Sequence, residues 1–259
     1  MKDKVIVITG ASAGIGAAVA RQAGALGAHV VLAARRPKEL EEAARASGDA
    51  ALAVVTDVTV RAQVDALASA AIARFGHVDV WINNAGRGIT RKVSELRDED
   101  LDAMITDNVK SSLYGMQAIL PHFKERGAGQ IINVSSLLGR VPFAPFRSAY
   151  SAAKHALNAL TACLRMELRA SHPGLVVTLV SPGVVATEFG TNALHGGMDS
   201  RAFPGAQSAD DAAAAVIDAI RTGKIDVYTQ ATGAATVQSY YADIEAHERT
   251  SPFAQPRRP

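Results

Sequence analysis

Short runs of continuous apolar residues alternate along the chain with longer alanine-rich stretches. A strand buried on both faces lacks the usual alternation of apolar and polar residues, so such runs are typical of a parallel sheet covered by helices on both sides. The runs predict six strands, at Val5–Thr9, His29–Ala33, Ala51–Val55, Val78–Ile82, Gln130–Val134 and Val176–Val180, with a weaker seventh at Ile225–Thr229. The intervening stretches predict helices at Gly16–Leu26, Pro37–Ala46, Val60–Phe75, Asp98–Lys124, Ser148–Ala170 and Ala209–Arg221. The predicted fold class is α/β, with a doubly wound parallel sheet.

No shift in composition marks a second domain, so residues 1–259 are predicted to form a single domain. The segment 189–208 is rich in glycine and polar residues and has no clear period. Long irregular loops of this kind are commonly functional, so we interpret it as a substrate-loop insertion. Residues 231–259 exceed what the core fold needs and are predicted to be a C-terminal extension.

The composition and the net charge indicate which kind of molecule the protein binds. Hydrophobic residues make up 48% and charged residues 20%, which is typical of a globular chain, and the single cysteine, Cys163, cannot form an intramolecular disulfide. The net charge is only +2, and the basic residues are scattered apart from Arg257 and Arg258. This favours small-molecule partners over nucleic acid or a membrane. The N-terminal apolar run is too short for a signal peptide, so we expect a cytoplasmic protein.

Three glycines occupy the turn between the first strand and the first helix. Gly10, Gly14 and Gly16 would let the backbone approach a pyrophosphate, while the helix N-terminus offers its free N–H groups to the anion. Glycines in a turn can also be purely structural. The motif alone therefore leaves both interpretations open.

Further polar residues follow the fourth and fifth strands. Asn83–Gly86 stands at the carboxyl edge of the sheet, where ligands bind in open α/β folds, although such a pair can also cap a turn. Tyr150 and Lys154 are one helical turn apart on one face. Lowering a phenol pKa from about 10 to about 7 requires about 4 kcal/mol, which one cation about 4 Å away supplies at an effective dielectric of about 20. The alternative is a solvated lysine beside a core tyrosine.

The end of the second strand bears on the choice of nucleotide. An NAD enzyme of this architecture normally has an acidic residue there, whereas this chain has Ala34 followed by Arg35 and Arg36. A guanidinium suits a 2′-phosphate, so we predict NADP(H), with Arg35 as the main contact. Ala13 stands where a second basic residue would strengthen that preference. The alternative is two solvated arginines.

The three motifs, Thr9–Gly16, Asn83–Gly86 and Tyr150–Lys154, resemble those of the short-chain dehydrogenase/reductase family over about residues 3 to 230. The resemblance implies seven parallel strands in the order 3-2-1-4-5-6-7, with a nicotinamide cofactor across the switch point. It places a catalytic asparagine on Asn108 and a catalytic serine on Ser136, with Ser135 as the less favoured alternative. The motifs and the resemblance together predict a cofactor-binding set made of Gly10, Ser12, Gly14, Ile15, Gly16, Arg35, Arg36, Asp57, Val58, Asn84, Ala85, Gly86, Tyr150, Lys154, Pro182, Gly183, Val185 and Thr187. Within this set Asp57 would lie beside the adenine and Thr187 on the nicotinamide carboxamide.

The resemblance implies an NADP(H)-dependent oxidoreductase that interconverts a ketone or aldehyde and an alcohol. Tyr150 would donate the proton and Ser136 would position the carbonyl oxygen. Lys154 would lower the pKa of Tyr150 and hold the nicotinamide ribose, and Asn108 would organise a water-linked proton relay. Two other hypotheses are a dinucleotide-binding sensor or scaffold without turnover, and an imine reductase or epimerase.

The remaining expectations concern the substrate and the assembly. An apolar wall predicts an apolar carbonyl substrate; its proposed members are Phe143, Phe146, Phe189, Leu194, Met198 and Phe203, together with Tyr240 and Tyr241 of the tail. The helices at 98–124 and 148–170 resemble subunit-contact helices and predict a homodimer or homotetramer. Trp81 and Cys163 are interpreted as buried packing residues, and no histidine spacing predicts a metal site.

Overall fold

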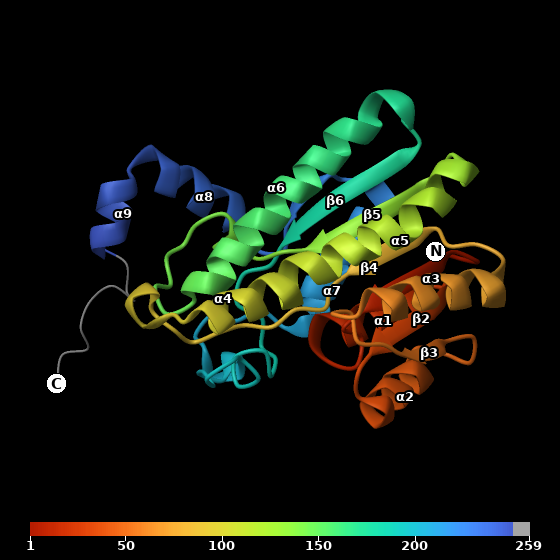
Figure 1. Ribbon diagram of the computed structural model, residues 1–259, viewed down its shortest axis with the longest axis horizontal. Helices are drawn as coiled ribbons and strands as arrows, with labels where there is room; N and C mark the ends of the chain where they lie inside the picture. The colour runs from red at the N-terminus through yellow and green to blue at the C-terminus, as the bar shows by residue number, and fades with distance from the viewer. Residues whose placement is uncertain (251–259) are drawn as a thin grey trace.

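The seven predicted strands form one parallel sheet in the order β3-β2-β1-β4-β5-β6-β7, as the resemblance implied. The computed structural model describes residues 1–250 (Figure 1). The strands are β1 (Val5–Thr9), β2 (His29–Ala34), β3 (Leu52–Val55), β4 (Val80–Asn83), β5 (Gly129–Val134), β6 (Leu175–Ser181) and β7 (Asp226–Tyr228). Each lies within a few residues of its predicted position, because continuous apolar character identifies a strand buried on both faces.

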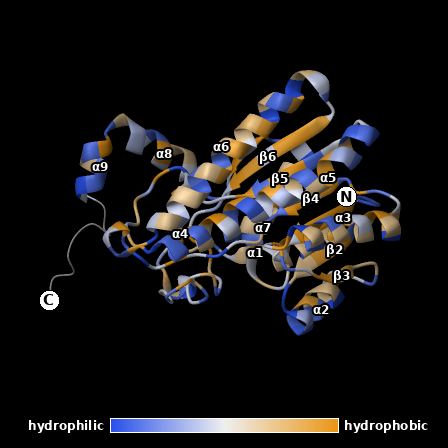
Figure 2. Cartoon of the chain, viewed as in Figure 1, coloured by the Kyte–Doolittle hydropathy of each residue, from blue (hydrophilic) through white to orange (hydrophobic). Residues whose placement is uncertain are grey.

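Helices cover both faces of the sheet. They are α1 (Gly14–Ala25), α2 (Pro37–Ala46), α3 (Arg61–Phe75), α4 (Asp98–Ile105), α5 (Ser111–Arg126), α6 (Ser148–Ser171), α7 (Ala209–Thr222), α8 (Gly233–Ala242) and α9 (Ile244–Thr250). One apolar core joins α1, α2 and α7 to the sheet, and the other joins α3 and α5 to its opposite face. Figure 2 shows the strands between these layers as the most hydrophobic part of the chain. Trp81 is fully buried in the second core, as predicted.

The helix predicted over Asp98–Lys124 is not a regular α-helix throughout. A π-helical turn, Thr106–Lys110, separates α4 from α5. A π-turn inserts one residue into the α-helical spacing and redirects the side chains beside it, and such turns occur frequently at functional sites. The inserted turn carries Asn108, whose side chain is fully buried.

The prediction that Cys163 is buried is wrong, because this residue lies on the outer face of α6. This thiol is exposed rather than buried, because Leu157, Thr161 and Leu168 occupy the face of α6 that packs inward. Leu160 and Met166 are exposed on the same helix. The apolar character of this part of α6 therefore does not come from packing within one chain.

The described part of the predicted extension, residues 231–250, forms α8 and α9, which lie at one end of the molecule (Figure 1). The Tyr241 hydroxyl donates a hydrogen bond of 2.9 Å to the backbone carbonyl of Arg140. Residues 251–259, with the Arg257–Arg258 pair, lie outside the described residues. No helix in residues 1–250 is both long and apolar enough to cross a membrane.

Candidate active site

A cleft of about 850 Å³ opens at the carboxyl ends of the strands. The strand order reverses between β1 and β4, so the loops that follow them diverge and leave a crevice, as in other doubly wound sheets. Nearly all of the predicted cofactor-binding residues line this cleft. The one exception in that set is Gly16, which is buried. The catalytic candidate Asn108 does not line the cleft either.

The glycine turn has the backbone geometry that a dinucleotide requires. Gly10 has a φ of +66°, and a Cβ atom there would lie 2.8 Å from the Cα atom of Ala85. A Cβ atom on Gly16 would lie 2.5 Å from the Asn84 side-chain nitrogen. No side chain caps the N-terminus of α1, and its first turn contains no acidic residue. Its free N–H groups are therefore suited to a pyrophosphate, and the site fits such a cofactor.

The two asparagines after β4 have different roles in the structure. Asn83 is buried and accepts a hydrogen bond of 2.8 Å from the Trp81 indole. The Asn84 amide donates to the backbone carbonyls of Thr9 and Gly10 at 2.9 and 3.1 Å. Asn84 therefore ties the end of β4 to the glycine turn, while Asn83 belongs to the interior.

The two serines after β5 also have different interaction partners. The Ser136 hydroxyl accepts a hydrogen bond from the Leu138 N–H at 3.1 Å, and its interaction with the Tyr150 phenol lowers the pKa of that phenol. The Ser135 hydroxyl donates to the side chain of Asn158 instead. The structure thus brings Ser136, rather than Ser135, beside Tyr150 in the cleft.

Burial governs the proton affinities of the tyrosine and the lysine. It raises the pKa of Tyr150 to about 12, and the hydrogen bond with Ser136 and the charge of Arg147 act in the opposite direction. Burial also lowers the pKa of Lys154 to about 7. The Lys154 ammonium nitrogen donates to the Val134 carbonyl at 3.0 Å and lies 5.7 Å from the centre of the Tyr150 ring. Burial therefore dominates the pKa of both groups, and the Ser136 hydroxyl and the Arg147 guanidinium oppose its effect on Tyr150.

The π-turn brings Asn108 close to the same place. Its amide donates to the Arg87 carbonyl at 2.9 Å, and its carbonyl oxygen accepts from the Arg87 N–H at 3.2 Å. A Cβ atom on Gly86 would lie 2.8 Å from that oxygen and 3.5 Å from the Lys154 nitrogen. Asn108 therefore holds the loop after β4 against the catalytic lysine candidate.

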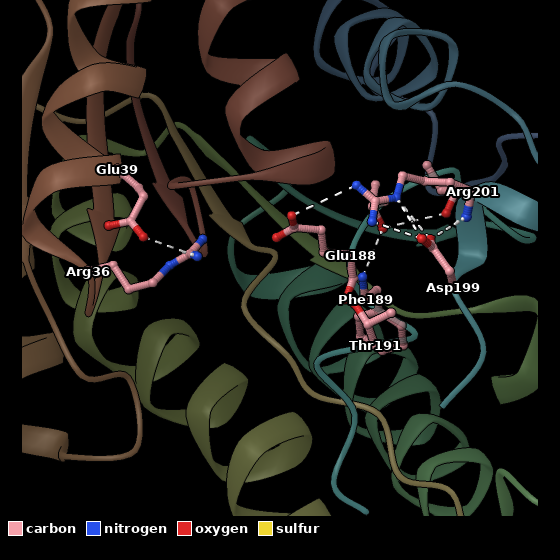
Figure 3. Close-up of polar contacts among 9 residues, drawn as sticks. Arg36, Glu39, Glu188, Phe189, Thr191, Asp199 and Arg201 are labelled. Carbon is pink, nitrogen blue, oxygen red and sulfur yellow. Dashed lines mark hydrogen bonds and ion pairs between the residues drawn. The ribbon is translucent and has the colours of Figure 1, made fainter. Parts of the chain in front are cut away.

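Arg35, Arg36 and Asp57, the residues predicted to face the adenosine, line the cleft. Arg36 donates to the Ser12 hydroxyl of the glycine turn at 3.3 Å and pairs with Glu39 at 3.3 Å (Figure 3). The Asp57 carboxylate accepts hydrogen bonds from the N–H and hydroxyl of Thr59. The sequence prediction missed Asp107, which also lines the cleft and whose pKa is raised by burial.

Not all of the residues predicted to form an apolar wall line the cleft. Five predicted residues line it, namely Phe143, Phe146, Phe189, Met198 and Phe203. Leu194 instead forms a bridge with Ile89, and Tyr240 and Tyr241 lie on α8 outside the cleft. Figure 3 shows Arg201 between Asp199 and Glu188 near Phe189; its ion pairs with them measure 2.8 and 3.9 Å.

Charged residues in this wall were missed by the sequence prediction. Arg87, Glu188 and Arg147 all line the cleft. For Arg147 a signal was available, because it stands three residues before Tyr150, at the predicted start of the same helix. The wall is therefore not uniformly apolar.

A glycine-lined nucleotide cleft with a tyrosine at one end defines a class of dinucleotide-binding oxidoreductases. Residues 4–196 match the family model described as short chain dehydrogenase, and the chain belongs to this family. It is 39% identical over 187 residues to an uncharacterized oxidoreductase of Staphylococcus epidermidis, covering 72% of this chain and 80% of that protein.

Solved structures support the same assignment. A short chain dehydrogenase/reductase from Burkholderia phymatum in complex with NAD has a TM-score of 0.84 and 29% identity, covering 100% of this chain and 98% of that one. A short chain dehydrogenase from Burkholderia cenocepacia in complex with NADP has a TM-score of 0.82 and 29% identity, covering 98% and 99%. These neighbours support a nicotinamide dinucleotide as the cofactor of this oxidoreductase.

Proposed function

We propose that this protein is an NADP(H)-dependent oxidoreductase that interconverts a ketone or aldehyde and the corresponding alcohol. The observation that carries the proposal is that Tyr150 and Ser136 line the same glycine-lined cleft, with Ser136 close enough to lower the pKa of the Tyr150 phenol. Two hydroxyls side by side can hold one carbonyl oxygen. One of them can then transfer a proton to that oxygen.

The cofactor supplies the hydride for the carbonyl carbon in one direction and accepts it in the other. Ser136 positions the carbonyl oxygen, and Tyr150 donates its proton to that oxygen during reduction. In the reverse direction Tyr150 accepts the proton from the alcohol. Lys154 holds the nicotinamide ribose, and Asn108 fixes the loop after β4 and connects the site to a proton relay.

The preference for NADP(H) rests on the end of β2. Ala34 leaves this place without an acidic side chain, and the two following arginines line the cleft. Arg36 reaches the Ser12 hydroxyl in the glycine turn, so a cationic group already lies between β2 and the phosphate-binding turn. A guanidinium there forms charge-assisted hydrogen bonds with a 2′-phosphate.

We also propose a domain organisation and an assembly. Residues 1–259 act as one catalytic domain, with 189–208 as the substrate loop and 231–259 as an extension that contacts the loop after Ser136 through Tyr241. The exposed apolar side chains of α6 favour a homodimer or homotetramer.

A panel of ketones and aldehydes, tested with NADPH and with NADH by loss of nicotinamide absorbance, tests the function. We expect NADPH oxidation that depends on the carbonyl compound and is abolished in Tyr150→Phe. Turnover by Tyr150→Phe at the rate of the unmodified enzyme would show that Tyr150 is not the proton donor. Tight binding of NADPH with no carbonyl reduction across the panel would favour a sensor instead.

A further inference from the structure

Arg147 and the catalytic tyrosine candidate, Tyr150, line the same cleft. Arg147 immediately precedes α6, and Tyr150 follows one helical turn later. Its Nη1 atom donates a hydrogen bond of 3.1 Å to the Ile89 carbonyl. The guanidinium has several further N–H donors, and the residue lines the cleft.

The surroundings of Arg147 place its guanidinium close to the backbone and to Phe189. A Cβ atom on Gly88 would lie 2.9 Å from Nη1 and 3.0 Å from the Phe189 ring. A Cβ atom on Gly197 would lie 3.1 Å from Nη2. The Phe189 ring centre is itself 5.4 Å from that of Tyr150. Phe189 thus lies beside both the guanidinium and the phenol, and all three face one small region.

The charge of Arg147 lacks an acidic partner within residues 1–250. Tyr150 is the only ionisable group that acts on it appreciably, and burial lowers its pKa. Two arginines nearby are paired, Arg201 with Asp199 and Arg91 with Asp100, whereas the Arg87 side chain donates to the Asn192 carbonyl at 3.4 Å. A partly desolvated cation without a counter-charge is costly. Such a group is retained most readily where a ligand supplies the counter-charge.

We propose that Arg147 binds a carboxylate of the substrate, so that the enzyme acts on oxo acids and the corresponding hydroxy acids. This inference rests on the proposed function, since it assigns a substrate class to the same cleft. The planar guanidinium matches the two oxygens of a carboxylate. The aromatic wall accommodates the carbon chain of the acid, while Tyr150 and Ser136 receive its oxo group.

Matched pairs of acid and ester test the proposal. The probes are 4-oxopentanoate and 4-oxo-4-phenylbutanoate, each compared with its methyl ester, which keeps the oxo group and removes the charge. We expect kcat/KM to favour the acids, and Arg147→Gln to lower kcat/KM for the acids by about 10- to 150-fold, as expected for loss of a hydrogen bond between charged groups. The ratio of acid to ester is the readout, because a change in the tyrosine pKa affects both members of a pair.

Two further variants separate the charge from the fold. Arg147→Lys keeps the cation without the planar fork and should restore part of the preference for the acid. Arg74→Gln removes an exposed arginine on α3, outside the cleft, and should leave the ratio unchanged. NADPH binding, followed by fluorescence, reports whether the Arg147 variants remain folded.

A binding measurement keeps the proposal testable if no carbonyl compound is reduced. Titration calorimetry compares pentanoate with pentanamide on the complex with NADP⁺. Tighter binding of pentanoate that disappears in Arg147→Gln supports the carboxylate site even if the proposed reaction is wrong. Reduction of the esters at least as efficiently as the acids, or equal binding of pentanoate and pentanamide, would overturn it while leaving carbonyl reduction standing.

Discussion

The imidazole Nε2 of His195 lies 2.6 Å from an Asp100 carboxylate oxygen. This contact joins the 189–208 loop to the start of α4, although the two residues are far apart in the sequence. Asp100 is buried, and Arg91 and Arg97 approach its other oxygen at 3.6 and 3.7 Å. His195 itself has a φ of +63°, which lies in the left-handed backbone region that residues other than glycine rarely adopt. Tertiary contacts therefore maintain this conformation.

Removal of this contact should loosen the substrate loop. We expect Asp100→Asn and His195→Ala to raise KM for the carbonyl substrate several-fold, with little change in NADP(H) affinity, because the loop borders the substrate end of the cleft. The hydrogen bond from His195 holds the pKa of Asp100 below its usual range. The contribution of the carboxylate is therefore complete above the usual carboxyl range and is lost as pH falls through the lowered pKa.

Steady-state kinetics and cofactor titrations on these variants check this prediction. Asp98→Asn, an exposed change in the first turn of the same helix, is the matched control. An unchanged KM in both Asp100→Asn and His195→Ala would show that the loop does not depend on this contact.

Replacement of Tyr150, the proposed proton donor, should affect chemistry without affecting nucleotide binding. We expect Tyr150→Phe to lower kcat by about 10²- to 10⁴-fold, the usual contribution of general acid catalysis. Tyr114→Phe is the control, because the Tyr114 ring packs under Arg61, away from the cleft. Measurement of kcat and of the NADPH dissociation constant for both variants tests this prediction. A parallel loss of nucleotide affinity in Tyr150→Phe would argue for a structural role.

The buried lysine predicts an unusual dependence of stability on pH. The folded chain releases the Lys154 proton above about pH 7, whereas the unfolded chain keeps it up to about 10.5. The unfolded state thus binds more protons in this interval, and stability rises with pH by up to about 1.4 kcal/mol per pH unit. Tyr150 acts oppositely from about pH 10 to 12, where the folded state keeps the proton that the unfolded state loses.

Urea unfolding at pH 7, 8, 9 and 10 measures this effect. The rise between pH 7 and 10 should be smaller in Lys154→Met than in the unmodified protein. Parallel stability curves for the two proteins would mean that Lys154 keeps its proton in the folded state.

The cofactor preference depends on the arginines after β2. We expect Arg35→Ala to lower kcat/KM for NADPH by about 10- to 150-fold, because one charge-assisted hydrogen bond contributes roughly 1.5–3 kcal/mol. Activity with NADH should change little. Arg36→Ala should have a smaller effect, since Glu39 already pairs with this guanidinium. Equal kcat/KM for both cofactors in the unmodified enzyme would refute the assignment.

The exposed apolar face of α6 predicts self-association. Met166 has 67% of its surface exposed and Leu160 has 36%, which favours burial against a second subunit. We expect light scattering at micromolar concentration to give a dimer or tetramer, and Leu160→Asp combined with Met166→Glu to lower the mass. Ser69→Asp, on the exposed side of α3, serves as a control for added charge. A mass near 27.0 kDa for the unmodified protein would contradict the prediction.

The pattern of apolar and polar residues was enough to predict the sheet and most of the cleft, and the family resemblance predicted the strand order. Continuous apolar runs identify strands buried on both faces, and parallel strands present their carboxyl ends at one edge. The residues after β1, β4 and β5 therefore had to meet, wherever the helices packed. Ser136 and Tyr150 are brought together in this way.

Tertiary structure alone decided the properties that depend on burial and on long-range contacts. Spacing places Lys154 one turn from Tyr150, but desolvation by the surrounding core sets the pKa of each group. The exposed position of Cys163 and the π-turn at Asn108 likewise depend on which face of a helix meets the sheet. The glycines at 88 and 197 let the chain pass beside the guanidinium of Arg147, and this residue lines the cleft. The local sequence pattern predicts which residues are buried in the core. Which charged side chains line the cleft depends on how distant segments pack together.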